Sequence, residues 1–169
     1  IDRLIERAKA LSMNSLALTD HGNLHGALEF YRKAKSHDLK PIIGYEAYIA
    51  PASRFHKDSG NMREAAFHLT LLAQNHAGFK NLLKLASAAY LEGFYFRPRI
   101  DKQLLTQHSE GLICLSGCAS GELNRILTAS SNPDVDKARQ AASWFRDLFG
   151  DRYFIEIQNN GLEIQRAGM

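Results

Sequence analysis

Short apolar segments alternate with amphipathic segments along the chain, and this alternation limits the fold more than any other feature of the sequence. The apolar segments are rich in β-branched and aromatic residues, as strands are; they cover residues 15–18, 41–49, 67–73, 111–116 and 153–157. Helical periodicity covers residues 1–11, 24–36, 77–91, 120–130 and 133–149, and a shorter helix is expected over 101–108. Strands that alternate with helices predict an α/β fold with parallel strand pairing, as either a barrel or an open sheet.

The size and composition are those of one ordinary globular domain. The chain has 169 residues, of which 45% are hydrophobic and 23% charged, and this predicts a single domain over residues 1–169 with a substantial core. No apolar run approaches the roughly 20 residues of a membrane helix, so no membrane partner is expected. The net charge of +3 permits contact with nucleic acid without arguing for it. Two cysteines are too few for a disulfide framework, which favours a reducing, cytoplasmic compartment.

Ionisable side chains gather near the ends of the expected strands, where α/β folds place their sites. Asp20 and His21 follow the first strand, and Glu46 lies in the second. His68 lies at the start of the third strand, and Cys118 follows the fourth. Imidazole, carboxylate and thiolate donors from separate strands are what a divalent-metal site requires. Taken singly, His68 is more ordinary as a hydrogen-bonded core histidine, and Cys118 as a small buried apolar residue.

The segment GFYFRPRID, residues 93–101, combines cations with aromatic rings. Arg97 and Arg99 follow the aromatic run Phe94–Phe96. This mixture suits single-stranded nucleic acid, because guanidinium groups bind its phosphates and aromatic rings stack on its bases. Both arginines are therefore candidate DNA contacts. The alternative is that the aromatic residues fill core and that Arg99 pairs with a carboxylate of the site.

Several blocks of the sequence resemble, in order and spacing, the polymerase and histidinol phosphatase (PHP) domain family. They are TDHGN (19–23), GYEAY (44–48), HLTLL (68–72) and SGCASGEL (116–123). The blocks NLLKLASAAYLEG (81–93) and GFYFRPRID resemble a narrower group. This group is the PHP domain at the amino end of the alpha subunits of bacterial DNA polymerase III, the C-family replicative polymerases. The resemblance covers nearly the whole chain.

The resemblance implies a distorted TIM-like (β/α)7 barrel that binds divalent metal ions (Zn, Mn or Fe, up to about three in a complete domain) at the carboxyl ends of its strands. The family's ligand positions fall on His21, Glu46, His68 and Cys118, with Glu46 as a bridging carboxylate. Asp20 would orient these ligands or a water. The family's first strand, with His-x-His, and its last, with Asn-Asp-x-His, have no counterpart in this sequence. We therefore expect an internal fragment of the domain, with about five strands and part of the ligand set.

A function is implied as well. The parent protein would be a DNA-directed DNA polymerase that uses Mg and works with DNA, a proofreading subunit, a sliding clamp and a clamp loader. Its PHP domain would be a metal-dependent phosphoesterase that trims DNA ends as a 3′–5′ exonuclease, although the fragment alone is expected to be inactive. Two alternatives remain open. One is a metal-stabilised scaffold that docks a separate proofreading subunit, and the other is a free-standing phosphoesterase of the histidinol phosphatase type.

Overall fold

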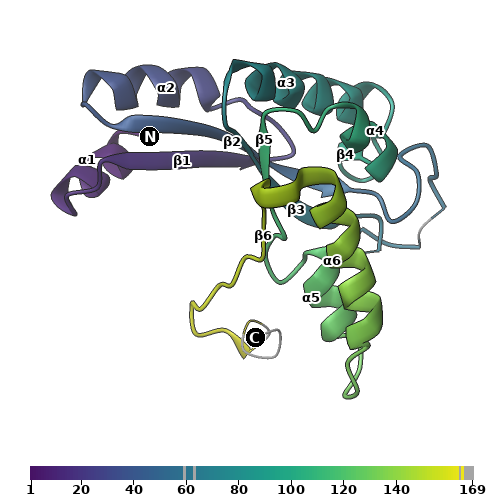
Figure 1. Ribbon diagram of the computed structural model, residues 1–169. Helices are drawn as coiled ribbons and strands as arrows, with labels where there is room; N and C mark the ends of the chain where they lie inside the picture. The colour runs from purple at the N-terminus through teal and green to yellow at the C-terminus, as the bar shows by residue number, and fades with distance from the viewer. Residues whose placement is uncertain (59, 63, 164, 166–169) are drawn as a thin grey trace.

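The computed structural model describes residues 1–58, 60–62, 64–163 and 165, and Figure 1 shows the arrangement of its elements. In chain order these are α1 (Asp2–Ala10), β1 (Ser15–His21), α2 (Ala27–Ser36), β2 (Lys40–Ile49), β3 (Phe67–Ala73), α3 (His76–Leu91), β4 (Arg99–Ile100), α4 (Lys102–Gln107), β5 (Leu112–Leu115), α5 (Glu122–Leu127), α6 (Val135–Phe149), the 3-10 helix η1 (Gly150–Arg152) and β6 (Tyr153–Phe154). Every strand expected from the sequence is present. The short strand β4 is an addition, inside the segment 93–101, where the sequence predicts no strand.

The strands form one sheet in the order β1-β2-β3-β5-β6, with β4 paired to β2. β1 and β2 are parallel, as are β2 and β4, and β5 and β6. β3 runs antiparallel to both β2 and β5, so the prediction of parallel pairing is wrong for this strand. The described part of the segment 50–66 contains no helix, so the chain turns back at the end of β2 instead of crossing over. The start of β3 therefore lies at the edge where β1 and β2 end.

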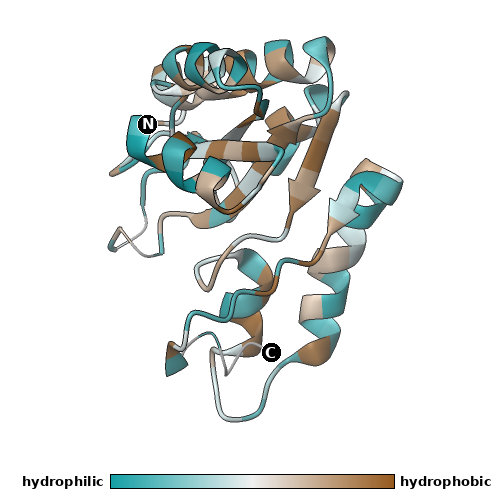
Figure 2. Cartoon of the chain, turned by 90° about the vertical axis from the view of Figure 1, so that its left-hand side faces the viewer, coloured by the Kyte–Doolittle hydropathy of each residue, from teal (hydrophilic) through white to brown (hydrophobic). Residues whose placement is uncertain are grey.

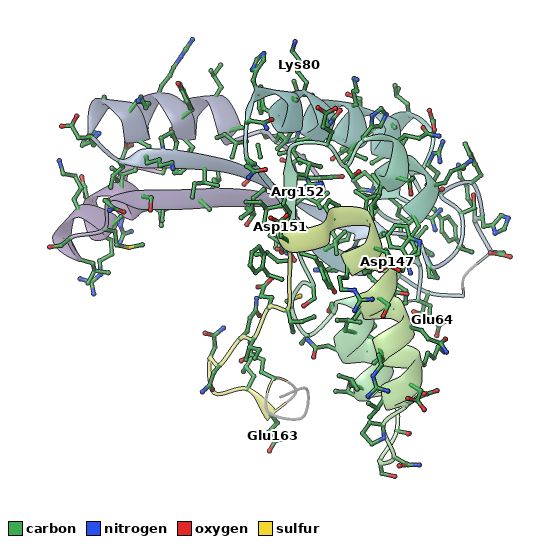
Figure 3. The ribbon with its side chains drawn as sticks, viewed as in Figure 1. Glu64, Lys80, Asp147, Asp151, Arg152 and Glu163 are labelled. Carbon is green, nitrogen blue, oxygen red and sulfur yellow. The ribbon has the colours of Figure 1, made fainter. Side chains whose placement is uncertain are left out.

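Helices bury the apolar side chains of this sheet. α2 and α3 lie along one side of the sheet, and α5 and α6 lie beyond its other side (Figure 1). The larger core cluster joins the central strands to α3, α4 and α6, and a smaller one joins α1 and α2 through Ile5, Ala8, Phe30 and Ala34. Figure 2 shows strongly apolar strands beside helices of mixed hydropathy. Lys80, on the outer side of α3, points away from the sheet (Figure 3).

The sheet is open within the described residues, with β1 and β6 at the two ends of its order. The strand expected over 153–157 pairs only over Tyr153–Phe154. Beyond it, Ile155 and Ile157 are 58% and 70% exposed. The fold is thus a mixed α/β arrangement with a six-stranded open sheet, and closure into a barrel is not seen in this part of the chain. None of the described helices is long and apolar enough to cross a membrane.

Candidate metal centre

The pairing register places three of the expected metal ligands on one face of the sheet. His21 pairs with Glu46 across β1 and β2. Tyr48 lies two residues after Glu46, on the same face, and pairs with His68 across β2 and β3. Paired residues point to the same face of a sheet, as do residues two apart in a strand. The antiparallel direction of β3 is what brings His68, at the start of its strand, to the ends of the other two.

The three side chains converge on a single carboxylate oxygen. Nε2 of His21 lies 3.1 Å from Oε1 of Glu46, and Nδ1 of His68 lies 2.7 Å from the same oxygen. One ligand atom from each residue lies within 4.8 Å of the others. Glu46 and His68 are mostly buried, with side chains 17% and 16% exposed, whereas His21 is 59% exposed. The group therefore lies at the edge of the sheet where β1 and β2 end and is open to solvent on the His21 side. We call this place the mouth of the site.

Cys118 joins this group from the turn between β5 and α5. Its Sγ lies 3.6 Å from Nδ1 of His68 and 4.0 Å from Oε1 of Glu46. The turn is held against the start of β3, because the N–H of His68 donates to the carbonyl of Ser120 at 3.0 Å. Gly117 has a φ of +85°, and a Cβ there would lie 2.6 Å from the carbonyl oxygen of His68. Only glycine allows this close approach, which delivers the thiol to the site.

Burial and hydrogen bonding shift the pKa values of these side chains in opposing directions. Burial raises the pKa of Glu46, but the hydrogen bond with His68 and the two nearby imidazoles outweigh it, so the pKa lies below its ordinary value. Burial lowers the pKa of His68, yet its hydrogen bonds with Cys118 and Glu46 raise it to about 9. Burial raises the pKa of the Cys118 thiol, but His68 and the N–H of Ser120 hold it below its ordinary value. The arrangement favours the charged forms of all three groups.

This set of donors fits a divalent metal ion. Two imidazole nitrogens, one carboxylate and one thiol meet within the short distances given above. Imidazole and thiolate suit zinc and iron, and the carboxylate also suits harder ions such as manganese. The predicted convergence of His21, Glu46, His68 and Cys118 is therefore present in the structure. Their role as metal ligands stays a prediction.

Asp20 lies on the other face of the sheet from His21. Its carboxylate accepts a hydrogen bond from the N–H of Gly26 at 2.8 Å, just before α2 begins. A Cβ on Gly26 would lie 2.9 Å from Leu18 and 3.0 Å from Asp20, so both side chains face this turn. The expectation that Asp20 orients the metal ligands is thus not met. Neighbouring residues of a strand point to opposite faces, and Asp20 anchors the start of α2 instead.

The two arginines of the segment 93–101 have different surroundings. Arg99 is 2% exposed, and its guanidinium donates to the backbone carbonyls of four residues, Arg54, His56, Ala65 and Gly93. The prediction that Arg99 contacts DNA is corrected here, because these carbonyls enclose its guanidinium. It does not pair with a carboxylate of the site either.

Arg97 lies at the mouth of the site and is partly buried. Its guanidinium carbon lies 4.6 Å from the ring centroid of Tyr48, and the same group donates to the Tyr48 hydroxyl. The neighbouring residues Phe94 and Phe96 are 50% and 47% exposed, so they do not fill core as the alternative interpretation required. Arg97 remains a candidate DNA contact.

Tyr48 is a residue of the site that the sequence did not single out. Its ring lies 4.9 Å from the ring of His68, edge to face, and 6.3 Å from the ring of His21. The available signal was its spacing, since a residue two positions after Glu46 in the same strand faces the same side. A tyrosine in an apolar strand gives no other sign of its role.

Comparison with known proteins identifies the family. The PHP domain model matches residues 1–160. The chain is 48% identical over 165 residues to a protein named DNA polymerase III subunit alpha from Borreliella burgdorferi, and 51% identical over 153 residues to one of the same name from Thermus aquaticus. These alignments cover 98% and 90% of the chain but only 14% and 12% of the relatives' own length. The chain belongs to the PHP domain family.

Proposed function

We propose that this chain is the PHP domain of a DNA polymerase III alpha subunit, in which it hydrolyses phosphodiester bonds as a metal-dependent 3′–5′ exonuclease. The observation that carries the proposal is the meeting of His21, Glu46, His68 and Cys118 at one mouth of the sheet. The names of the relatives support a place in DNA replication. The open sheet would then be the larger part of a distorted TIM-like (β/α)7 barrel, in which further strands pair with β1 and β6.

In this proposal, some residues of the chain bind metal and another binds the phosphate of the substrate. His21, Glu46, His68 and Cys118 would hold divalent ions such as Zn, Mn or Fe, and the Glu46 carboxylate, on which both imidazoles converge, would be the shared ligand. A bound ion supplies Lewis acidity toward a phosphoryl oxygen and toward a water. Arg97 binds the phosphate of the DNA end. One water is consumed, the bond between phosphorus and the 3′ oxygen breaks, and the shortened strand keeps a 3′ hydroxyl while a nucleoside monophosphate leaves.

The parent protein supplies the proposed context. Its main reaction would be Mg-dependent DNA synthesis in the cytoplasm, carried out by residues outside this chain. Its partners would be DNA, a sliding clamp, a clamp loader and a separate proofreading subunit. Trimming by the PHP domain would remove a mispaired 3′ nucleotide before synthesis resumes.

The test uses the full-length parent protein and a single-stranded oligonucleotide labelled at its 5′ end, without added nucleotides. Glu46→Gln keeps the shape of the side chain and should lower the trimming rate by about a hundredfold or more. His21→Ala should also lower the trimming rate. His25→Ala is its matched control and should not, because His25 is an exposed histidine in the same turn and is not among the converging residues. DNA synthesis should be retained in every variant, because the residues proposed to carry it out lie outside this chain.

Trimming by Glu46→Gln at the wild-type rate would exclude the proposed site. If the wild-type protein holds metal at this site but does not trim DNA, the activity is excluded and the scaffold interpretation takes its place. In that case the metal would serve stability and the docking of a separate proofreading subunit.

A further inference from the structure

We propose that Tyr48 is a positioning residue with two separate tasks: its ring fixes the imidazole of His68, and its hydroxyl holds the guanidinium of Arg97 at the mouth as a phosphate-binding group. The part that concerns substrate phosphate rests on the proposed function. The part that concerns metal binding needs only the converging ligands.

The ring of Tyr48 restricts the imidazoles from one side. It is 6% exposed and meets the ring of His68 at 4.9 Å with an angle of 83° between the ring planes. It also lies 6.3 Å from the ring of His21. Edge-to-face contacts of this kind are directional, so they hold a preferred ring orientation. An imidazole ligand must present one nitrogen to a metal in a set direction, and the packing of Tyr48 limits rotation away from it.

The ring is itself held by two turns. A Cβ on Gly22 would lie 2.9 Å from Cε2 of Tyr48 and 2.9 Å from Cγ of Pro98. Gly22 has a φ of +69°, and its N–H donates to the carbonyl of Glu46 at 2.9 Å. The turn after β1 and the segment that carries Arg97 therefore close against the same ring. This leaves Tyr48 little freedom to move without disturbing both.

The hydroxyl of Tyr48 faces Arg97. Nη1 of Arg97 donates to this hydroxyl, and the guanidinium carbon lies 4.6 Å from the ring centroid. Nη2 lies 3.2 Å from the sulfur of Met62. No carboxylate forms a salt bridge with Arg97 in the part of the chain that the structure describes. A guanidinium fixed by a hydroxyl and a ring, without an internal anion, keeps donors for an external phosphate.

The surroundings of Tyr45 differ from those of Tyr48, and this difference makes Tyr45 a comparison for the role of the Tyr48 hydroxyl. It lies in the same strand, three positions earlier, and is fully buried. Its hydroxyl has no hydrogen-bond partner among the described residues. Tyr45 pairs with Asp20 in the β1–β2 register, so its ring faces the side of the sheet opposite the site. Both tyrosines are buried in β2, but only Tyr48 contacts the site. A comparison of variants at the two positions therefore distinguishes the effect of burial from the effect of contact with the site.

The experiment measures two kinds of binding in the full-length protein. Zinc affinity is measured with a competing chelator, and the binding of inorganic phosphate to the zinc-loaded protein is measured by calorimetry. Tyr48→Phe keeps the ring and removes the hydroxyl, so zinc affinity should stay within about twofold while phosphate binding weakens by about tenfold. Tyr48→Leu removes the ring and should also weaken zinc affinity by about tenfold to a hundredfold.

Variants of Arg97 and Tyr45 are the controls for the two tasks of Tyr48. Arg97→Gln should reproduce the phosphate defect of Tyr48→Phe, and the double variant should bind phosphate no worse than either single variant, because both remove the same contact. Tyr45→Phe should leave both affinities unchanged. Full phosphate binding by Tyr48→Phe, or full zinc affinity of a folded Tyr48→Leu, would overturn the corresponding task of Tyr48. Neither measurement requires nuclease activity, so a failure of the proposed function is recognised separately by the trimming assay.

Discussion

At the scale of single residues, Asp20 and His21 show how two adjacent ionisable groups serve different ends. They are neighbours in β1, so their side chains lie on opposite faces of the sheet. His21 meets Glu46 at the mouth, whereas Asp20 accepts the N–H of Gly26 where the chain enters α2. His21 thus lies among the candidate metal ligands, whereas Asp20 supports the local fold, although the two residues are adjacent in the sequence.

Asp20→Ala is expected to lower the local free energy of opening by about 1 kcal/mol, because the N–H of Gly26 loses its acceptor. Hydrogen exchange of the amides near the start of α2 in the full-length protein measures this change. Bound zinc, measured after dialysis, should equal that of the wild type. His21→Ala should behave in the reverse way, with less zinc and unchanged exchange at α2. A zinc loss in Asp20→Ala as large as in His21→Ala would return Asp20 to the metal site.

As a proposed metal ligand, His68 would bind metal in competition with protons. Burial lowers the pKa of His68, but hydrogen bonds with Cys118 and Glu46 raise it to about 9. Below that pH the imidazole carries a proton that must leave before the nitrogen can bind a metal. Zinc affinity should therefore rise with pH up to about 9, by about tenfold for each unit for this one proton. Chelator competition at several pH values tests this, and an affinity independent of pH below 9 would contradict the raised pKa.

At the scale of elements, the mouth depends on two irregular segments that Arg99 holds together. Its guanidinium donates to Gly93 on one side and to Arg54, His56 and Ala65 on the other. The buried carboxylate of Asp101 adds to this connection, because it accepts from the backbone and the guanidinium of Arg54 at 2.9 and 3.0 Å. These contacts fix the described parts of the segments 50–66 and 93–98 beside the converging ligands. Arg99, one of the two arginines that the sequence suggested for DNA contact, thus connects these loops through its buried hydrogen bonds.

Arg99→Met is expected to cost about 3 kcal/mol or more of local stability, since several buried carbonyls lose their donors together. The loss should appear as faster hydrogen exchange in the segments 50–66 and 93–98. Arg97→Gln should leave that exchange unchanged but reduce the salt dependence of single-strand binding by about 0.7 per lost phosphate contact. Equal exchange in wild type and Arg99→Met would show that the carbonyl contacts contribute little. An unchanged salt slope in Arg97→Gln would remove Arg97 from the DNA contacts.

At the scale of the whole molecule, the candidate ligands tie together distant parts of the chain. They come from β1, β2, β3 and the turn after β5, and each strand contributes at the same edge. A metal held by all of them binds the folded arrangement and not the unfolded chain, so its binding energy adds to the stability of the fold.

Zinc added at about a hundred times its dissociation constant should stabilise the full-length protein's PHP domain by about 2.7 kcal/mol. The first thermal transition should move up with zinc and down with a chelator. Glu46→Ala should lower the metal content and remove most of this shift, because both imidazoles converge on its carboxylate. The same zinc-dependent shift in Glu46→Ala and wild type would place the responsible metal elsewhere.

The sequence by itself determined the positions of the helices and of every strand except β4, because periodicity is a local property. It also placed His21, Glu46, His68 and Cys118 near strand ends, but the resemblance to the PHP family was needed to select them as candidate ligands, since His68 and Cys118 taken singly are more ordinary as core residues. Tertiary structure alone decided the direction of β3, the enclosure of Arg99 and the contact of Tyr48 with His68. Each of these depends on the register between segments far apart in the chain, and no local pattern encodes which way a strand runs after a long loop without a helix.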